Sequence, residues 1–189
     1  MNKKIPIEVS ARHVHLSQKD LETLFGSGYQ LKEMRRLTQP NDFAAEETLA
    51  IQANGKELKD VRIVGPIRRE TQIEISLTDM INLDIKTKAE ILGDLSGTDG
   101  ITLIGPKGRV DIDNCIIIAG RHLHCTADEA KGLGLKHGEI ISILVKGQRE
   151  TTFHNVKVRV GEGYRLCLQL DTDEGNAAGI NQQGEGEVC

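Results

Sequence analysis

The sequence contains few aromatic residues, carries no excess of positive charge and has no long hydrophobic run. Aromatic residues account for 3% of the 189 residues and tryptophan is absent, so few rings can stack on single-stranded nucleic-acid bases. The formal net charge of −4 provides no general attraction to a nucleic-acid backbone. No apolar run approaches the roughly 20 residues that a membrane helix needs. We therefore expect neither a nucleic-acid partner nor a membrane partner.

Cysteine is scarce as well, and its spacing argues against disulfides. The chain has four cysteines, none of them in a CxxC pair: Cys115, Cys125, Cys167 and Cys189. The N-terminal stretch MNKKIPIEVS has no hydrophobic region of the signal-peptide type. We expect reduced thiols and a cytoplasmic protein. A metal site in this chain would depend mainly on histidine and carboxylate.

Short alternating or β-branched segments, separated by Gly, Asn and Asp, dominate the chain. About nine such segments of strand length, together with 20 glycines, are typical of small β-barrels, which need tight corners between strands. The sequence therefore predicts a mainly β fold with few, short helices. The segments are IPIEV, TLAIQA, VRIVG, TQIEIS, ITLIG, CIIIAG, EIISILV, NVKVRV and RLCLQL.

An internal repeat links two distant parts of the chain. SARHVHLS at 10–17 recurs as AGRHLHCT at 119–126. After each copy a hydroxyl residue, Ser17 or Thr126, can cap a helix that carries an acid three residues later. SLTDMINLDI at 76–85 is a weaker third copy of this strand-to-helix corner. Duplication of one structural unit is the simplest explanation.

The repeated His-x-His pairs are candidate metal ligands. On an extended segment the two histidines of a pair lie on one face, because side chains alternate with period two. Imidazole is a standard ligand of Zn²⁺, so two pairs suggest two ions. A single His-x-His is commonly only a surface feature of a strand, but the repetition with the same preceding Arg favours a functional role. The candidates are His13, His15, His122 and His124.

Four segments in order resemble the PduL-type phosphotransacylases, the phosphate propanoyltransferase family. They are VSARHVHLS at 9–17, GPIRRETQIEISLTD at 65–79, AGRHLH at 119–124 and LDTDEGNAAG at 170–179. Together they extend over nearly the whole chain.

The resemblance implies two similar small β-barrels with short capping helices, the first strand packing in the barrel formed by the C-terminal half. Residues 1–11 and 120–189 would form one barrel, and residues 12–92 the other, with a lid at about 26–46. Residues 93–119 would connect them. Two zinc ions would lie between the barrels.

The resemblance also implies the ligands of these ions. His13, His15 and a glutamate of ETQIEIS would bind the first, and His122, His124 and a histidine before the DTDE motif the second. We prefer Glu74 to Glu70 for the glutamate, because Ile73 and Ile75 claim the other face of that strand.

The chain departs from the family pattern at Gln169, where the family usually has histidine. Because an amide oxygen suits zinc less well than imidazole does, we expect weaker binding of the second ion. Gln169 could ligate weakly or hold a water, Cys167 could supply a thiolate, or His154 could reach the site. Gln169 is otherwise an ordinary strand residue and Cys167 a small apolar filler.

The implied reaction is the reversible transfer of an acyl group between coenzyme A and inorganic phosphate. Arg68 would hold phosphate beside the zinc ions, although it could also be a solvated arginine at a barrel rim. The positions that match the family's CoA contacts are Ser10, Arg62 and Asn176, with Arg35 of the lid as a further candidate. Ser10 could equally be a polar strand residue and Arg35 a solvated charge of the lid. Arg62 could be an outward-facing strand residue, and Asn176 a turn former in DEGNAAG.

Arg12 and Arg121, which precede the histidine pairs, could bind anions or, as we favour, pair with the acids of DTDE.

Family members that enter bacterial microcompartments usually carry an amphipathic N-terminal extension, and only MNKK precedes IPIEV here, so we expect location in the free cytosol. Dimers are usual in the family, and a homodimer is expected.

Three hypotheses about function remain open at this point. The first is a zinc-dependent phosphotransacylase acting on propanoyl-CoA or acetyl-CoA. The second is a two-metal hydrolase of thioesters or phosphoesters, which the same ions could support. The third is a non-catalytic CoA- or zinc-binding paralogue, because of Gln169. The chain has no GxSxG or Walker A motif that would point to other chemistry.

Overall fold

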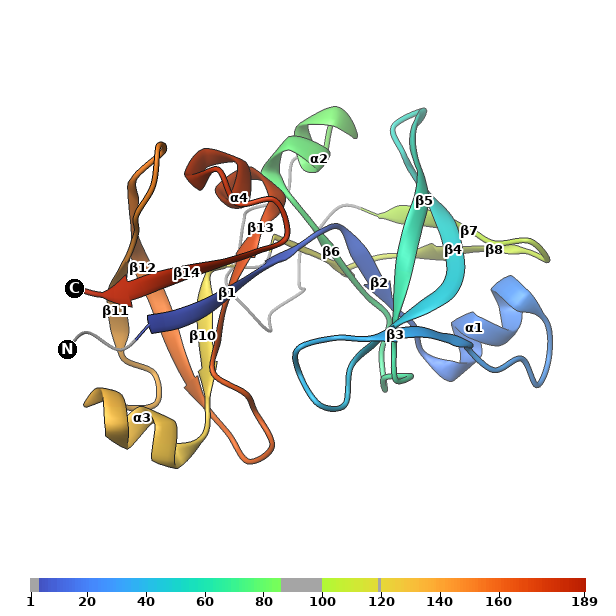
Figure 1. Ribbon diagram of the computed structural model, residues 1–189. Helices are drawn as coiled ribbons and strands as arrows, with labels where there is room; N and C mark the ends of the chain where they lie inside the picture. Colours follow the sequence, from blue (N-terminus) through green and yellow to red (C-terminus); the bar gives the residue numbers. More distant parts are fainter. Residues whose placement is uncertain (1–3, 86–99, 119) are drawn as a thin grey trace. The chain divides into compact units, whose positions relative to one another are not determined.

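A computed structural model describes residues 4–85, 100–118 and 120–189, and nearly half of them lie in β-strands (Figure 1). The chain forms two compact units. The first, which we call the barrel unit, comprises Met1–Ala11, Thr38–Pro40 and Gly120–Cys189. The second, the sheet unit, comprises Arg12–Leu37 and Asn41–Ala119. The expectation of a mainly β protein with short helices is confirmed.

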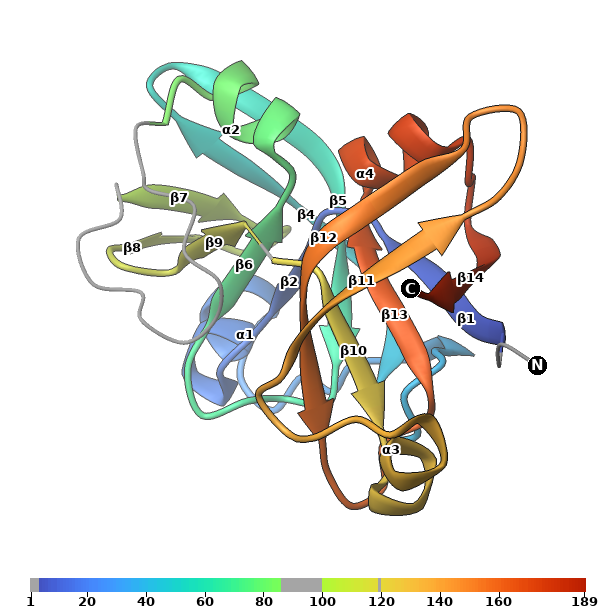
Figure 2. The same ribbon diagram turned by 90° about the vertical axis from the view of Figure 1, so that its left-hand side faces the viewer.

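The barrel unit is a closed barrel of six strands (Figure 2). In pairing order these are β1 (Lys4–Ser10), β13 (Cys167–Asp171), β10 (His122–Cys125), β12 (Thr151–Val160), β11 (Ile140–Val145) and β14 (Gln183–Val188). The N-terminal strand β1 runs parallel to β13 and antiparallel to β14. The first strand therefore packs in the barrel formed by the C-terminal half, as expected, and it closes the barrel.

Alternation of side chains explains why β1 fits there. Ile5 and Ile7 are buried in the barrel core, whereas Pro6 is exposed and Glu8 is partly exposed on the opposite face. The same alternation places Leu123 of β10 in the core and turns both neighbouring histidines to the outer face. Burial of the apolar face thus determines the direction in which the histidine pair points.

The sheet unit is an eight-stranded sheet, which in the described residues is a half-barrel. Its strand order is β8 (Arg109–Ile112), β7 (Ile101–Ile104), β4 (Phe43–Ala53), β5 (Lys56–Gly65), β2 (His13–His15), β6 (Gln72–Ile75) and β9 (Ile116–Ile118), with β3 (Glu33–Arg36) paired to β4. The turn Asn54-Gly55 joins β4 to β5 with positive φ at both residues, which matches the twist of a two-residue hairpin.

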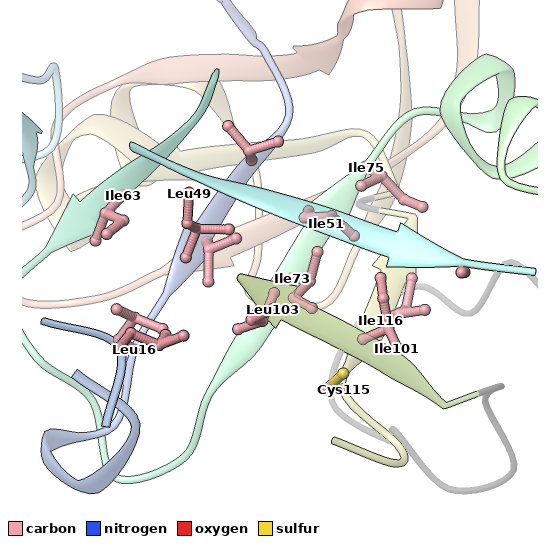
Figure 3. Packing of buried hydrophobic residues seen from close by; sticks show 14 of the residues in the cluster. Leu16, Leu49, Ile51, Ile63, Ile73, Ile75, Ile101, Leu103, Cys115 and Ile116 are labelled. Atoms are coloured by element: carbon pink, nitrogen blue, oxygen red, sulfur yellow. The ribbon is translucent and has the colours of Figure 1, made fainter. Parts of the chain in front are cut away.

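The core of the sheet unit is aliphatic (Figure 3). Ile51, Ile63, Ile73 and Leu103 are fully buried and come from four different strands. Val14 of β2 also belongs to this core, so His13 and His15 on either side of it face away from the core. The same geometric rule therefore orients both histidine pairs.

Each helix of the described chain begins with an N-cap and an acid three residues later. The helices are α1 (Gln18–Phe25), α2 (Leu77–Asn82), α3 (Ala127–Leu133) and α4 (Thr172–Ala178). The caps of α1 and α3 are the expected Ser17 and Thr126, and Ser76 caps α2 in the weaker third copy of the corner. Helix α3 continues through Gly132 and ends at Leu133, and Gly134 caps it in the left-handed conformation.

One assignment from the sequence needs correction. Residues 93–119 were expected to connect two barrels, but residues 101–104, 109–112 and 116–118 form β7, β8 and β9 of the sheet unit. The alternating apolar residues of ITLIG and the buried run III explain why these segments pair as strands. Residues 93–99 and 119 lie outside the described residues. Among the described helices, none has the length and apolar character required to cross a membrane.

Candidate metal and substrate site

The first histidine pair and Glu74 bring three ligand atoms together on the sheet unit. His13 Nε2 lies 3.2 Å from His15 Nε2 and 3.7 Å from Glu74 Oε2, and His15 Nε2 lies 3.8 Å from Glu74 Oε1. All ligand atoms of this group lie within 4.8 Å of one another. Ligands bonded to tetrahedral zinc at about 2.0–2.1 Å are about 3.3 Å apart. The three side chains therefore have the types and spacing that a Zn²⁺ ion requires.

Strand pairing produces this arrangement. β2 and β6 are antiparallel, with His13 directly opposite Glu74 and His15 directly opposite Gln72. Glu70 precedes β6 and is exposed, so the structure places Glu74 and not Glu70 beside the histidines. The half-buried carboxylate contributes a negative charge next to two imidazole nitrogens.

His15 is held in the form that binds metals. Its Nδ1 lies 2.9 Å from the carbonyl oxygen of Val64, and as donor it leaves the lone pair of Nε2 facing His13 and Glu74. Burial, together with the nearby His13 and Arg68, lowers the pKa of His15 to about 2. The imidazole is therefore neutral at physiological pH, as a metal ligand must be.

Arg68 is connected to this group through Gln72, which sequence analysis did not select. Arg68 Nη1 donates to Gln72 Oε1 at 3.2 Å, and Gln72 Nε2 donates to Glu74 Oε1 at 3.2 Å. The backbone N–H of Arg68 donates to the carbonyl of Leu16 at 2.9 Å, which ties the loop to the end of β2. Gln72 could have been noticed because it is two residues before Glu74 and therefore shares its face.

The second histidine pair lies on the outer face of the barrel unit. His122 Nδ1 is 2.9 Å from the carbonyl of Gly120, which leaves Nε2 available as a ligand. The ring of His124 stacks on Tyr164 with centroids 4.3 Å apart, and its buried Nδ1 has no hydrogen-bond partner among the described residues. Burial and the neighbouring His122 and Arg159 lower the pKa of His124 to about 3. His124 is therefore a neutral imidazole, and His122 offers a second ring nitrogen beside it.

Among the described residues, no third histidine, cysteine or carboxylate ligand joins this second histidine pair. Gln169 lies directly opposite His122 on the antiparallel strand β13. Its Nε2 donates to Glu8 Oε2 at 2.8 Å, so the nitrogen side of the amide is committed to a carboxylate. In the described chain, the group of His13, His15 and Glu74 is the one in which three histidine, cysteine or carboxylate ligands converge. The residues at the second position do not fit a three-ligand zinc site.

The other two residues considered for this position do not complete it either. Cys167 is buried opposite His124, where burial and then Glu8 raise the pKa of the thiol to about 12, so the group is protonated. His154 is exposed, and its Nδ1 lies 2.7 Å from the hydroxyl of Ser142 on the neighbouring strand β11. The expectation that Cys167 fills space is consistent with its burial.

The arginines before the histidine pairs form structural ion pairs. Arg121 Nε donates to Glu174, the last acid of DTDE, as favoured from the sequence. Arg12 pairs instead with Asp79, the corresponding acid of SLTD, through a hydrogen bond of 2.9 Å from Nε to Oδ2 and a 2.7 Å approach of Nη2 to Oδ1. The expected partner of Arg12 was therefore wrong. The positions of DTDE and SLTD in the sequence do not show which helix follows the strand paired with β2.

We expect Arg12→Ala to lower the free energy of unfolding by about 2 kcal/mol, because Asp79 would keep a buried carboxylate without its counter-ion. The side chain of Asp79 is 1% exposed and that of Arg12 is 42% exposed, which puts the effect below that of a fully buried pair. Urea unfolding of the metal-free protein measures this difference. Arg36→Ala is the control, because its ion pair with Glu33 is exposed and should contribute less than about 1 kcal/mol. Equal stability of the two variants would contradict the structural role of Arg12.

The four candidate CoA contacts occupy different elements. On the barrel unit, Ser10 ends β1 opposite Asp171, and Asn176 is exposed in α4. On the sheet unit, Arg35 is exposed in β3, and Arg62 lies opposite His13 on β5. Arg62 Nη1 donates to the carbonyls of residues 45 and 46, so part of its guanidinium stabilises a β-bulge.

Comparison with known proteins gives one consistent result. The family model described as phosphate propanoyltransferase matches residues 6–181. A phosphate propanoyltransferase of Thermotoga maritima is 44% identical over 178 residues, which cover 94% of this chain and 85% of that protein. The proteins of that name from Lachnoclostridium phytofermentans and Salmonella typhimurium are 42% and 40% identical, covering 93% and 94% of this chain and 83% and 84% of their own lengths.

Proposed function

Because the chain belongs to the phosphate propanoyltransferase family and is an acyltransferase, we propose that it transfers a propanoyl or acetyl group reversibly between coenzyme A and inorganic phosphate. In the direction of acyl phosphate formation, a phosphate oxygen attacks the thioester carbonyl carbon, the carbon–sulfur bond breaks, and the sulfur leaves as the thiolate of CoA. The observation that carries the proposal is the three-ligand group of His13, His15 and Glu74, connected to Arg68 through Gln72.

His13, His15 and Glu74 would hold a zinc ion. That ion would act as a Lewis acid that stabilises the negative charge on the carbonyl oxygen and on the departing sulfur. Val64 keeps His15 in the ligating tautomer, and Gln72 orients the carboxylate of Glu74. The protein thus fixes the ligand geometry before substrate binds.

Arg68 would bind the phosphate substrate. Its bond to Gln72 uses one of the five N–H donors of the guanidinium, and the planar fork matches two oxygens of a phosphate. A fixed phosphate oxygen attacks more readily than one from bulk solution, because the orientation of the two reactants has already been established. Ser10, Arg35, Arg62 and Asn176 remain our candidates for contacts to CoA.

An assay of thiol release from propanoyl-CoA and acetyl-CoA by the zinc-loaded protein tests the proposal. We expect release that depends on phosphate and yields acyl phosphate, which hydroxylamine traps as a hydroxamate. Release without phosphate and without hydroxamate would instead support the hydrolase hypothesis, in which water is the nucleophile. No release of CoA from either substrate would support a non-catalytic binding protein. The comparison of the two substrates also determines the preferred acyl group.

A further inference from the structure

The two units place equivalent residues around their histidine pairs. In the sheet unit, β6 runs antiparallel to the histidine strand and puts Glu74 directly opposite His13. In the barrel unit, β13 runs antiparallel to the histidine strand and puts Gln169 directly opposite His122. Each opposing strand leads into a capped helix, α2 or α4, whose acid at the third position pairs with the arginine before the histidines. Gln169 therefore occupies the position of the third ligand.

The surroundings of Gln169 differ from those of Glu74 in charge and in hydrogen bonding. Glu74 accepts a hydrogen bond from Gln72 and directs both carboxylate oxygens toward the histidine nitrogens. Gln169 is neutral and donates to Glu8, whose other carboxylate oxygen accepts a hydrogen bond of 2.8 Å from Thr38 Oγ1. Glu8 thereby anchors the amide from one side.

We propose that the protein binds one metal ion tightly, at His13, His15 and Glu74, and that the pair of Gln169 and Glu8 leaves the equivalent position of the barrel unit at least about a hundredfold weaker for zinc. This inference rests on the proposed function for the first site. It assigns a mononuclear resting state to a chain whose repeat offers two histidine pairs.

Loss of the third ligand weakens the second position and does not erase it. His122 and His124 each still provide one ring nitrogen as a metal ligand. In His124 the buried Nδ1 has no hydrogen-bond partner in the described chain, so its lone pair is available to a metal ion. Three protein ligands are the usual minimum for a catalytic zinc site, and an amide oxygen matches zinc poorly beside imidazole. Two tightly bound ions are therefore not expected.

The metal content of the protein tests the inference without reference to activity. Apoprotein of the full chain is titrated with Zn²⁺ in the presence of a chromophoric chelator that competes for the ion. We expect one equivalent to be taken from the chelator, a second only at about a hundredfold higher free zinc, and loss of the first in His15→Ala. Two equivalents of equal affinity in the native chain, or none, would overturn the inference.

Substitutions of Gln169 test whether this residue is the cause of weak zinc binding at the second histidine pair. Gln169→His should raise the tight stoichiometry from one to two, whereas Gln169→Met, which preserves the length but removes the amide, should leave it at one. A stoichiometry of one in Gln169→His would refute the assignment of this position. Should the native chain bind two ions, a fall to one in Glu8→Gln or Cys167→Ser would show which side chain supplies the ligand and would overturn the role given to Gln169.

The thiol assay separates this inference from the proposed function. Two tight ions together with phosphate-dependent release would overturn the mononuclear state and leave the transferase function intact. One tightly bound ion without any thiol release would support the mononuclear state and overturn the transferase function. The zinc titration and the thiol assay therefore test the two proposals separately.

Discussion

Glu74→Gln is expected to lower the rate of phosphate-dependent CoA release by at least about a thousandfold, a barrier increase of about 4 kcal/mol. The substitution preserves the size of the side chain but removes the carboxylate whose oxygens lie 3.7 Å and 3.8 Å from the two histidine nitrogens. The rate is measured with the thiol assay at saturating substrate, and bound zinc is measured in parallel. The rate of CoA release and the amount of bound zinc should both decrease.

Glu70→Gln is the matched control for this experiment. Glu70 precedes β6 and is exposed, and no contact connects it with the ligand group in the described structure, so its variant should keep activity within about twofold and retain the metal. Full activity in Glu74→Gln would remove this carboxylate from the site. Inactivity of Glu70→Gln alone would mean that the wrong glutamate of ETQIEIS had been chosen.

Arg68→Lys should raise the KM for phosphate by at least about tenfold while leaving the KM for acyl-CoA within about twofold. Lysine preserves the charge but lacks the planar fork that binds two phosphate oxygens at once, and it cannot make the same oriented bond to Gln72. Initial rates measured against phosphate concentration give this KM. A change smaller than threefold in both the KM and kcat would exclude Arg68 from phosphate binding.

Arg69→Lys is the control for Arg68, since Arg69 is the next residue in the chain and is exposed. Its kinetic constants should equal those of the native protein. If both substitutions raised the KM for phosphate to the same degree, the effect would come from the general positive charge of the loop. A selective effect at Arg68 would instead support a bidentate contact.

Much of the fold follows from local patterns in the sequence. Alternation in IPIEV, ITLIG and NVKVRV predicts strands with one buried face, and the structure has strands at all three places. Ser17 and Thr126 predict helix starts because a hydroxyl followed by an acid three residues later satisfies free backbone N–H groups. The His-x-His spacing likewise predicts that each pair shares a face, since the side-chain period of a strand is two.

Other features depend on which strands pair, and local patterns do not contain that information. β3 is exposed along its whole length, and β8 alternates over only two apolar residues, Val110 and Ile112, so neither was predicted as a strand from the sequence. The partner of Arg12 is in α2 because β6, which leads into that helix, pairs with β2. Asp79 could be identified as a buried acid only when that pairing was known.

The sequence by itself determined the residue types available for the chemistry: two His-x-His pairs, a glutamate on a strand face and a glutamine two residues before the DTDE motif. Only the tertiary structure decided which of these side chains converge. Cross-strand register brings Glu74 to His13 and Gln169 to His122, and the closing strand β1 brings Glu8 to Gln169. The physical reason is that ligand distances of a few ångströms are set by hydrogen-bonded register between strands far apart in the chain, whereas a sequence pattern specifies only the face on which each residue lies.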